Sequence, residues 1–300
     1  MRLAPIALFV YKRLSHARET VEALRGNSLA SESDLVVFSD GPKTEAEAGD
    51  VSAVRNYVRG VRGFKSVAVV ERAENVGLAS SIIQGVTQLS DQCGRVIVME
   101  DDLLTSPRFL EYMNFGLEYY QGVDRIMQIA GHMFPVRLEL KEDALLLPFI
   151  SSCGWGTWQR AWQYFDSAGR GFEQLVSDRR LRRTFDLNGH YRYFRMLKRQ
   201  RAGRVESWAI RWYLSVFLRG GLALYPKRTL VQNLGFDGSG TNCNLSQVAQ
   251  DSIDPVFSVG RLPESIETSP LAAEVYRGIP APRRGARGIV DRLRRALSIS

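Results

Sequence analysis

Residues 95–107 read Arg-Val-Ile-Val-Met-Glu-Asp-Asp-Leu-Leu-Thr-Ser-Pro, an apolar run that ends in three consecutive carboxylates. The run 96–99 has no polar alternation, which is typical of a strand buried on both faces of a parallel sheet. Pro107 favours the start of a helix, because proline is well tolerated at the first helical position. We therefore predict a buried strand, an acidic end and a following helix.

Apolar runs of the same kind alternate with helical patterns through the first half of the chain. Strands are predicted at 6–10, 35–38 and 66–70, and helices follow the first and third of these runs. A repeat of about thirty residues is typical of a mostly parallel sheet covered by helices. Ligands bind such sheets beyond the carboxyl ends of the strands, where polar residues stand at 11–13, 39–41 and 100–102.

Three adjacent acids at the end of a buried strand repel one another unless a cation compensates their charge. Mg²⁺ or Mn²⁺ would do so, using one or two carboxylates together with substrate phosphate oxygens. The alternative is an acidic loop that caps the helix beginning near Ser106 and Pro107. The strand-end position of Glu100, Asp101 and Asp102 favours the metal.

Residues 98–103, Val-Met-Glu-Asp-Asp-Leu, followed by Ser-Pro-Arg-Phe-Leu-Glu-Tyr at 106–112, resemble the acidic motif of GT-A fold glycosyltransferases. Among these enzymes the motif is most similar to that of the N-acetylglucosaminyltransferase I group and its bacterial relatives. The segments 11–13 and 39–41 match the nucleotide-binding positions of that family, and the resemblance runs from about residue 5 to 245. It implies a GT-A type, Rossmann-like α/β fold, with residues 1–150 as the half that binds a nucleotide-sugar.

The resemblance also implies roles for the matching residues. Asp102 would coordinate Mn²⁺ or Mg²⁺ on the diphosphate of the donor, and the other matching positions would hold the nucleotide and its sugar. Arg13 and Asp40 are expected to contact the nucleotide, and Asp40 is expected to reach the base edge. The sugar and ribose contacts are expected from Asn75, Ser81, Glu100 and Asp101.

Residues 151–262 are expected to form the acceptor-binding and catalytic half, with mixed strand directions. Trp155 and Trp208 are predicted to contact the acceptor, whereas Trp158 and Trp162, four apart on one helical face, favour core packing. Inverting transfer needs a carboxylate that deprotonates the acceptor hydroxyl, and Glu206 is assigned as this base. Capping of the next helix is the alternative role for Glu206.

The segment 230–243 resembles the closing strand and the glycine-rich loop of the family. Such a loop could close over the donor and exclude water. Many GT-A enzymes have a metal-binding histidine near this point, but this chain has Asn242. His16, His132 and His190 show no metal-ligand spacing and are expected to be structural or exposed.

The chain has 300 residues, is 45% hydrophobic and 24% charged, and has a formal net charge of +8, which excludes collagenous, disulfide-scaffold and disordered classes. Segment 179–204 carries +9 and segment 283–300 carries +5. After a linker at 263–284, residues 285–300 form a basic amphipathic pattern that predicts binding to an anionic membrane surface. The apolar amino-terminal run is short and lacks a cleavage site, so a cytoplasmic protein, peripheral on the inner membrane, is expected.

Three functions are compared. The first is a metal-dependent, inverting glycosyltransferase that moves a sugar, such as N-acetylglucosamine or another hexose, from a UDP-linked donor to a saccharide or lipid-linked acceptor. A sugar nucleotidyltransferase would need a glycine-rich phosphate loop after the first strand, and 11–15 contains no glycine. A nucleic-acid-binding protein would use the basic segment 179–204 with Tyr191, Tyr193 and Phe194, but leaves the acidic triplet unexplained. Nucleic acid is therefore not an expected partner.

Overall fold

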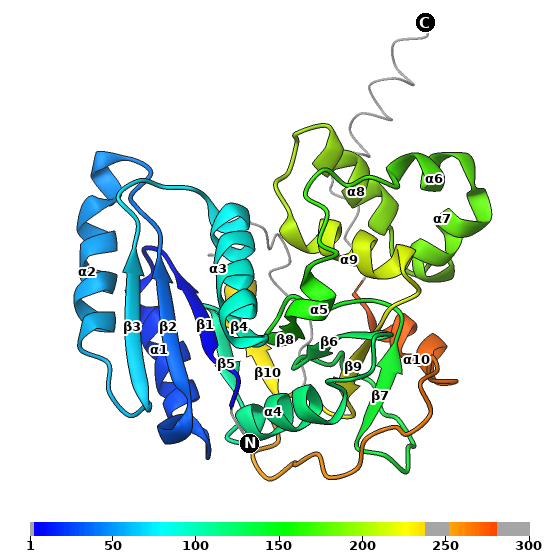
Figure 1. Cartoon of the computed structure of the whole chain (residues 1–300), viewed down its shortest axis with the longest axis horizontal. Coiled ribbons are helices and arrows are strands. Elements are labelled where there is room, and N and C mark those ends of the chain that lie inside the picture. The colour runs from blue at the N-terminus through cyan, green and yellow to red at the C-terminus, as the bar shows by residue number, and fades with distance from the viewer. Residues whose placement is uncertain (1–2, 238–251, 281–300) are drawn as a thin grey trace, which may run out of the picture.

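A computed structural model describes residues 3–237 and 252–280, and Figure 1 shows their arrangement. The centre is an eight-stranded sheet with the strand order β3-β2-β1-β4-β8-β6-β9-β7. The strands of this sheet are β1 (Ile6–Val10), β2 (Asp34–Ser39), β3 (Ser66–Glu71), β4 (Arg95–Glu100), β6 (Ile126–Ala130), β7 (Ala144–Leu147), β8 (Trp155–Trp158) and β9 (Leu222–Pro226). The mixed α/β architecture expected from the sequence is confirmed.

The four strands predicted in the first half are parallel neighbours. β1 lies between β2 and β4, and all five of its residues are buried, which accounts for its uninterrupted apolar sequence. β3 is the edge strand and pairs only with β2. Its residues alternate between exposed and half-buried, since one face of this strand reaches solvent.

The remaining strands run in both directions, and two of them, β6 and β7, already lie within residues 1–150. β8 is antiparallel to both β4 and β6, β6 is parallel to β9, and β7 closes the edge antiparallel to β9. The sheet therefore continues without interruption across residue 150.

Helices cover the sheet, and a group of further helices lies beyond one end of it (Figure 1). α3 packs on β1 and β4 and also contacts α9, so it joins the two halves of the chain. The helices are α1 (Leu14–Arg25), α2 (Ala48–Arg59), α3 (Leu78–Cys93), α4 (Phe109–Tyr119), α5 (Gln159–Trp162), α6 (Phe172–Ser177), α7 (Arg179–Phe185), α8 (Tyr193–Arg201), α9 (Trp208–Leu218) and α10 (Ala272–Gly278).

A two-stranded sheet stands beside the main one. In it, β5 (Leu103–Thr105) pairs antiparallel with β10 (Val231–Asn233). β5 begins directly after the acidic triplet, so this pairing brings residues 231–235 against Asp102, although more than 120 positions separate them in sequence.

The expected linker at 263–284 is wrong for its described part. α10 packs into the second hydrophobic cluster of the molecule, where Val275 is fully buried and Ala272 and Tyr276 are nearly so. Apolar burial of this extent holds the segment on the domain. Residues 281–300, with the predicted membrane-binding tail, and Asn242 lie outside the described residues. Within the described residues, no helix is long and apolar enough to cross a membrane.

Candidate functional site

The candidate site lies at the carboxyl ends of β1 and β4. These strands are parallel neighbours, and Phe9 is in register with Glu100. The residues that follow β1 therefore stand beside the residues that follow β4. This explains why Arg13 and the acidic triplet meet, although nearly ninety positions separate them.

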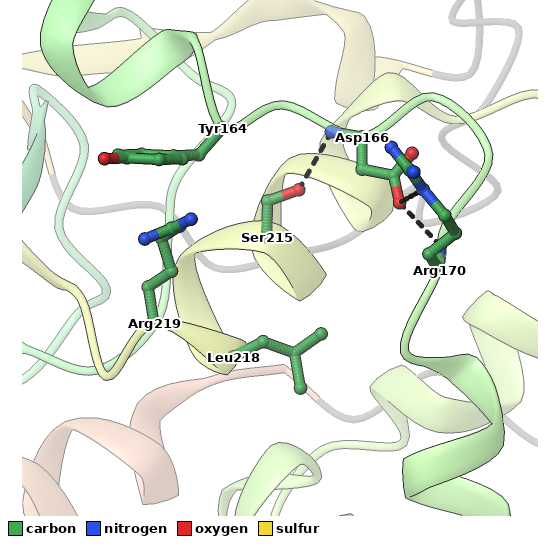
Figure 2. A pocket seen from close by; sticks show the side chains of 6 residues that line it. All are labelled: Tyr164, Asp166, Arg170, Ser215, Leu218 and Arg219. Carbon is green, nitrogen blue, oxygen red and sulfur yellow. Dashed lines mark hydrogen bonds and ion pairs between the residues drawn. The ribbon is translucent and has the colours of Figure 1, made fainter.

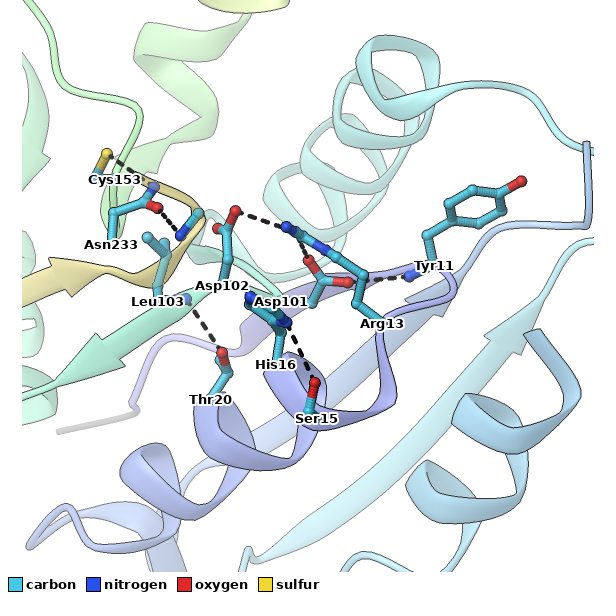
Figure 3. Close-up of polar contacts among 11 residues, drawn as sticks. Tyr11, Arg13, Ser15, His16, Thr20, Asp101, Asp102, Leu103, Cys153 and Asn233 are labelled. Atoms are coloured by element: carbon cyan, nitrogen blue, oxygen red, sulfur yellow. Dashed lines mark hydrogen bonds and ion pairs between the residues drawn. The ribbon is translucent and has the colours of Figure 1, made fainter. Parts of the chain in front are cut away.

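Arg13 holds both aspartates of the triplet. Its Nη2 donates to Oδ1 of Asp101 and, over 3.1 Å, to Oδ2 of Asp102, as Figure 3 shows. The backbone N–H of Tyr11 donates to Oδ2 of Asp101 over 3.4 Å. The structure brings Arg13, Asp101 and Asp102 together as predicted, but the guanidinium faces the carboxylates. Direct contact between Arg13 and a nucleotide stays a prediction.

Burial dominates the electrostatics of the triplet. Burial, together with the neighbouring Asp102 and Asp101 carboxylates, raises the pKa of Glu100 to about 8, against the opposing effect of Arg13. Burial also raises the pKa of Asp101, although Arg13 acts in the opposite direction. The negative charge of this strand end is thus only partly compensated by the described residues.

Asp102 has an oxygen that no described group satisfies. The residue is 8% exposed, and Oδ1 is buried without a hydrogen-bond partner. A buried carboxylate oxygen without a partner is costly, and a hard cation would relieve this cost. Asp102 was the predicted metal ligand, and its environment fits that role.

Segment 231–235 packs against Asp102. The Leu234 N–H donates to the Asp102 carbonyl over 2.8 Å, and the Gly235 N–H donates to Oδ1 of Asn233 over 2.7 Å. A Cβ on Gly235 would lie 2.6 Å from Oδ2 of Asp102 and 3.0 Å from Oδ1 of Asn233. Glycine at this position thus allows the backbone to approach the side-chain oxygens of Asp102 and Asn233 closely. Among the described residues, no three His, Cys, Asp or Glu side chains form a metal cluster.

Asp40 organises a loop. Its Oδ1 accepts from the N–H groups of Gly41 and Val76, and its Oδ2 accepts from the N–H of Gly77, each over 3.0 Å. The carboxylate is 6% exposed. Both oxygens thus face backbone groups of the protein, and Asp40 positions the 75–77 loop. The expected contact between Asp40 and a base edge stays a prediction.

The 75–77 loop brings two other predicted residues close. The Asn75 side chain donates to the Gly41 carbonyl over 2.8 Å, and Glu206 lies near Gly77. Oε2 of Glu206 is 3.7 Å from the position of a Cβ on Gly77. Ser81 is buried in the first turns of α3, with 3% of its surface exposed. Its predicted ribose contact, like that of Asn75, stays a prediction.

Glu206 is exposed and does not cap α9. Ser207 occupies the N-cap position, and its side chain accepts from the Ile210 N–H. Glu206 therefore does not have the helix-capping role that was its alternative. Asp40 and Glu206 flank the same loop, which links the predicted base to the carboxyl end of β2.

The two tryptophans expected at the acceptor are buried. Trp155 is 0% and Trp208 is 4% exposed, and their rings stack at a centroid distance of 5.0 Å. Neither indole has a free face for a sugar in this structure, so we replace the expected contact with a packing role. Trp158 and Trp162 are 3% and 4% exposed, as predicted for core residues.

One group of contacts was not indicated by the sequence. The Tyr11 hydroxyl and Lys12 Nζ both donate to Glu47 over 2.5 Å, and the Lys43 N–H donates to the same carboxylate. The hydrogen bonds from Lys12 and Tyr11 lower the pKa of Glu47 to about 2. Glu47 ties the segment after β1 to the segment after β2, and only the fold brings it there. Asn233 and Gly235 were missed for the same reason.

Sequence comparisons give no relative. No model of a known protein family matches the chain, and no curated protein sequence matches it. Among the solved structures that resemble part of it is the mannosyltransferase PcManGT from Pyrobaculum calidifontis, in complex with GDP-Man and Mn²⁺, with 14% identity and a TM-score of 0.38. That match covers 53% of this chain and 44% of the mannosyltransferase.

Two structures of S. aureus TarS are also similar. One has 14% identity, a TM-score of 0.33 and coverage of 50% of this chain and 25% of TarS. The other, residues 1–349 of TarS, has 10% identity, a TM-score of 0.45 and coverage of 79% and 62%. The chain spans less than two thirds of each of these three structures. At such TM-scores the likeness assigns no activity.

Proposed function

We propose that the protein is a metal-dependent glycosyltransferase that uses a nucleoside-diphosphate sugar as donor. The observation that carries this proposal is the unsatisfied Oδ1 of Asp102, buried at the carboxyl ends of parallel strands. Crevices at this edge of open α/β sheets bind nucleotides. The sequence resemblance to GT-A enzymes favours a UDP-linked sugar.

The described residues at this site would have separate roles in donor binding. Asp102 would hold a divalent ion, and Arg13 would keep the Asp101 and Asp102 carboxylates in place. A divalent ion at this site would stabilise the diphosphate leaving group. Glu100 would hold a sugar or ribose hydroxyl, whose proton its carboxylate oxygens can accept in a hydrogen bond.

Glu206 is proposed as the general base of an inverting transfer. Its carboxylate is exposed and lies against the 75–77 loop, which Asp40 holds through two of its N–H groups. From there it would accept the proton of the acceptor hydroxyl as that oxygen attacks the donor sugar. General-base catalysis typically contributes about 10²–10⁴-fold to the rate.

The nucleic-acid alternative loses support from the packing of segment 179–204. Phe194 stacks on Phe172, and Tyr193 packs against Tyr191 and Tyr213. These rings contact one another and do not form an open platform for bases. The predicted role of 285–300 in binding an anionic membrane, for a lipid-linked acceptor, remains a proposal, tested by liposome binding after deletion of that segment.

The experiment that tests the proposed function is release of nucleoside diphosphate from a panel of UDP-, GDP- and dTDP-sugars in the presence of Mn²⁺. We expect one nucleotide class to be turned over, and Glu206→Gln to lower the rate by about 10²–10⁴-fold while nucleotide binding persists. Glu264→Gln, which changes a carboxylate outside the site, is the matched control. Equal rates for Glu206→Gln and wild type would remove Glu206 from catalysis, and no turnover of any donor with Mn²⁺ bound would contradict the proposed function.

A further inference from the structure

A pocket of about 220 Å³ lies between α8, α9 and the loop that precedes α6. It is lined by residues 167–169, by the apolar Phe172 and Leu197, and by Gln200, Arg201 and Arg211. Asp166 fixes the loop, since its carboxylate accepts from the N–H groups of Ala168 and Arg170 over 3.0 and 2.7 Å. Part of the pocket wall is therefore built from ordered polar groups.

Arg211 in this wall has donor capacity that the described residues do not use. Its Nε donates to the Ser207 carbonyl over 3.2 Å and its Nη1 to the Ser167 carbonyl over 3.3 Å, while Nη2 is buried without a hydrogen-bond partner. Burial lowers the pKa of this guanidinium, and Glu206 acts in the opposite direction. An arginine anchored by two carbonyls and lacking a third partner is prepared for an anion.

No acidic side chain lines the pocket. Arg201 stacks over the Phe172 ring at 4.7 Å and pairs with Glu173, whose side chain is 71% exposed. Surrounding the pocket is the basic segment 179–204, whose exposed cations include Arg195, Lys198 and Arg199. Its single acid, Asp186, is engaged inside the protein by the Phe194 N–H over 2.7 Å. The region therefore attracts anions.

A second arginine-lined hollow nearby makes the contrast clear (Figure 2). There Arg170 pairs with Asp166, and Arg219 lies over the Tyr164 ring, with its guanidinium carbon 3.2 Å from the ring centroid. Both cations already have a partner. Arg211 also lies over a ring, that of Phe165, with its guanidinium carbon 6.0 Å from the centroid. Of these two hollows in the described part of the chain, the Arg211 pocket is the one with a buried guanidinium nitrogen that lacks a hydrogen-bond partner and with a lining free of acids.

We infer that the Arg211 pocket is an acceptor subsite that binds an anionic group of the acceptor, a carboxylate or a phosphate, and so selects an acidic saccharide. This inference rests on the proposed function, because it takes Glu206 as the base. Glu206 precedes α9 by two residues and interacts electrostatically with Arg211. An acceptor held by its anionic group at Arg211 would have a neighbouring hydroxyl within the reach of a base at the start of the same helix.

The test is titration of the purified protein with glucuronate, with inorganic phosphate and with neutral glucose, followed by NMR or calorimetry. The variants are Arg211→Gln and, as a matched control near the end of the same helix, Arg219→Gln. We expect glucuronate or phosphate to bind wild type and Arg219→Gln, and Arg211→Gln to bind about tenfold or more weakly, because a hydrogen bond to a charged group is lost. Thermal unfolding of each variant checks that it is folded.

Each outcome has a meaning. Binding of phosphate without glucuronate identifies a phosphorylated saccharide, and the converse identifies a uronic acid. Because phosphate could also enter the donor site, the titrations are repeated on Asp102→Asn, where binding should persist. Equal affinity in wild type and Arg211→Gln, no anion binding at all, or equal binding of glucose overturns the inference. Mn²⁺-dependent binding of UDP to Arg211→Gln distinguishes this failure from failure of the proposed function.

Discussion

Nη2 of Arg13 lies 3.1 Å from Oδ2 of Asp102, and the same nitrogen also hydrogen-bonds Asp101. A single side chain from the segment after β1 therefore supplies the positive charge beside the acidic end of β4. A divalent ion at Asp102 would act on the same carboxylate.

Arg13→Gln tests this relationship. The variant leaves Asp101 and Asp102 without their cation, and we expect the free energy of unfolding to fall by about 2 kcal/mol without metal. Mn²⁺ should restore part of the loss, so it should stabilise the variant more than it stabilises wild type. Urea unfolding with and without Mn²⁺ measures both effects. The control Arg108→Gln removes an exposed pair with Glu111 and should change stability by less than about 0.5 kcal/mol. An identical Mn²⁺ response in Arg13→Gln and wild type would count against the shared carboxylate.

Gly235→Ala tests the space beside Asp102. The new Cβ would come 2.6 Å from Oδ2 of Asp102 and displace that carboxylate, because real Cβ atoms do not approach so closely. We expect Mn²⁺-dependent binding of UDP to weaken by about tenfold or more, since each hydrogen-bonded or ionic contact to a charged group is worth about 1.5–3 kcal/mol. Calorimetric titration measures the affinity. Gly122→Ala, where a Cβ meets nothing within 4 Å, should bind as wild type does.

Asp40→Asn tests the organisation of the 75–77 loop. The amide replaces one of the two oxygens that accept from Gly41, Val76 and Gly77, so one N–H loses its acceptor. We expect a loss of about 1–3 kcal/mol in the free energy of unfolding. Hydrogen exchange at Val76 and Gly77 should accelerate, whereas the exposed control Asp50→Asn should leave it unchanged. Unaltered exchange at both amides in Asp40→Asn would refute the loop assignment.

His132 should make the fold sensitive to acid. Burial lowers the pKa of its imidazole to about 4, against 6.5 for the ordinary group. The unfolded chain therefore binds a proton first, and the stability present above about pH 6.5 is lost as the pH falls toward 4. His132→Gln should remove about 2 kcal/mol of the difference in unfolding free energy between pH 7 and pH 5. The exposed His190 provides the control His190→Gln, which should keep the wild-type pH dependence. If His132→Gln keeps the wild-type pH dependence too, desolvation of this imidazole is not the source of the acid sensitivity.

The parallel half of the fold could be predicted because each of its strands has a recognisable pattern in its own stretch of sequence. β1 and β4 are buried by neighbours on both sides, which requires continuous apolar residues, and each run ends in polar residues where the sheet edge meets solvent. The meeting of Arg13 with Asp101 and Asp102 followed from that register. These features depend on short stretches of sequence.

Other features depend on contacts between distant segments. From the sequence, the carboxylate oxygens of Asp40 could equally have faced a ligand. Only the path of the 75–77 loop shows that they accept hydrogen bonds from backbone N–H groups. Trp155 looked accessible because glycines flank it, yet Trp208 covers its ring. The pairing of β5 with β10 brought Gly235 to Asp102, and no local pattern indicates that contact.

The central claim is that Asp102 holds a divalent ion on the diphosphate of a nucleotide. Calorimetric titration of UDP into the protein, with and without Mn²⁺, tests this claim on wild type and on Asp102→Ala. We predict that Mn²⁺ strengthens UDP binding to wild type and has no such effect on Asp102→Ala, while both proteins unfold cooperatively. Equal Mn²⁺-dependent UDP affinity in the two proteins would contradict the account.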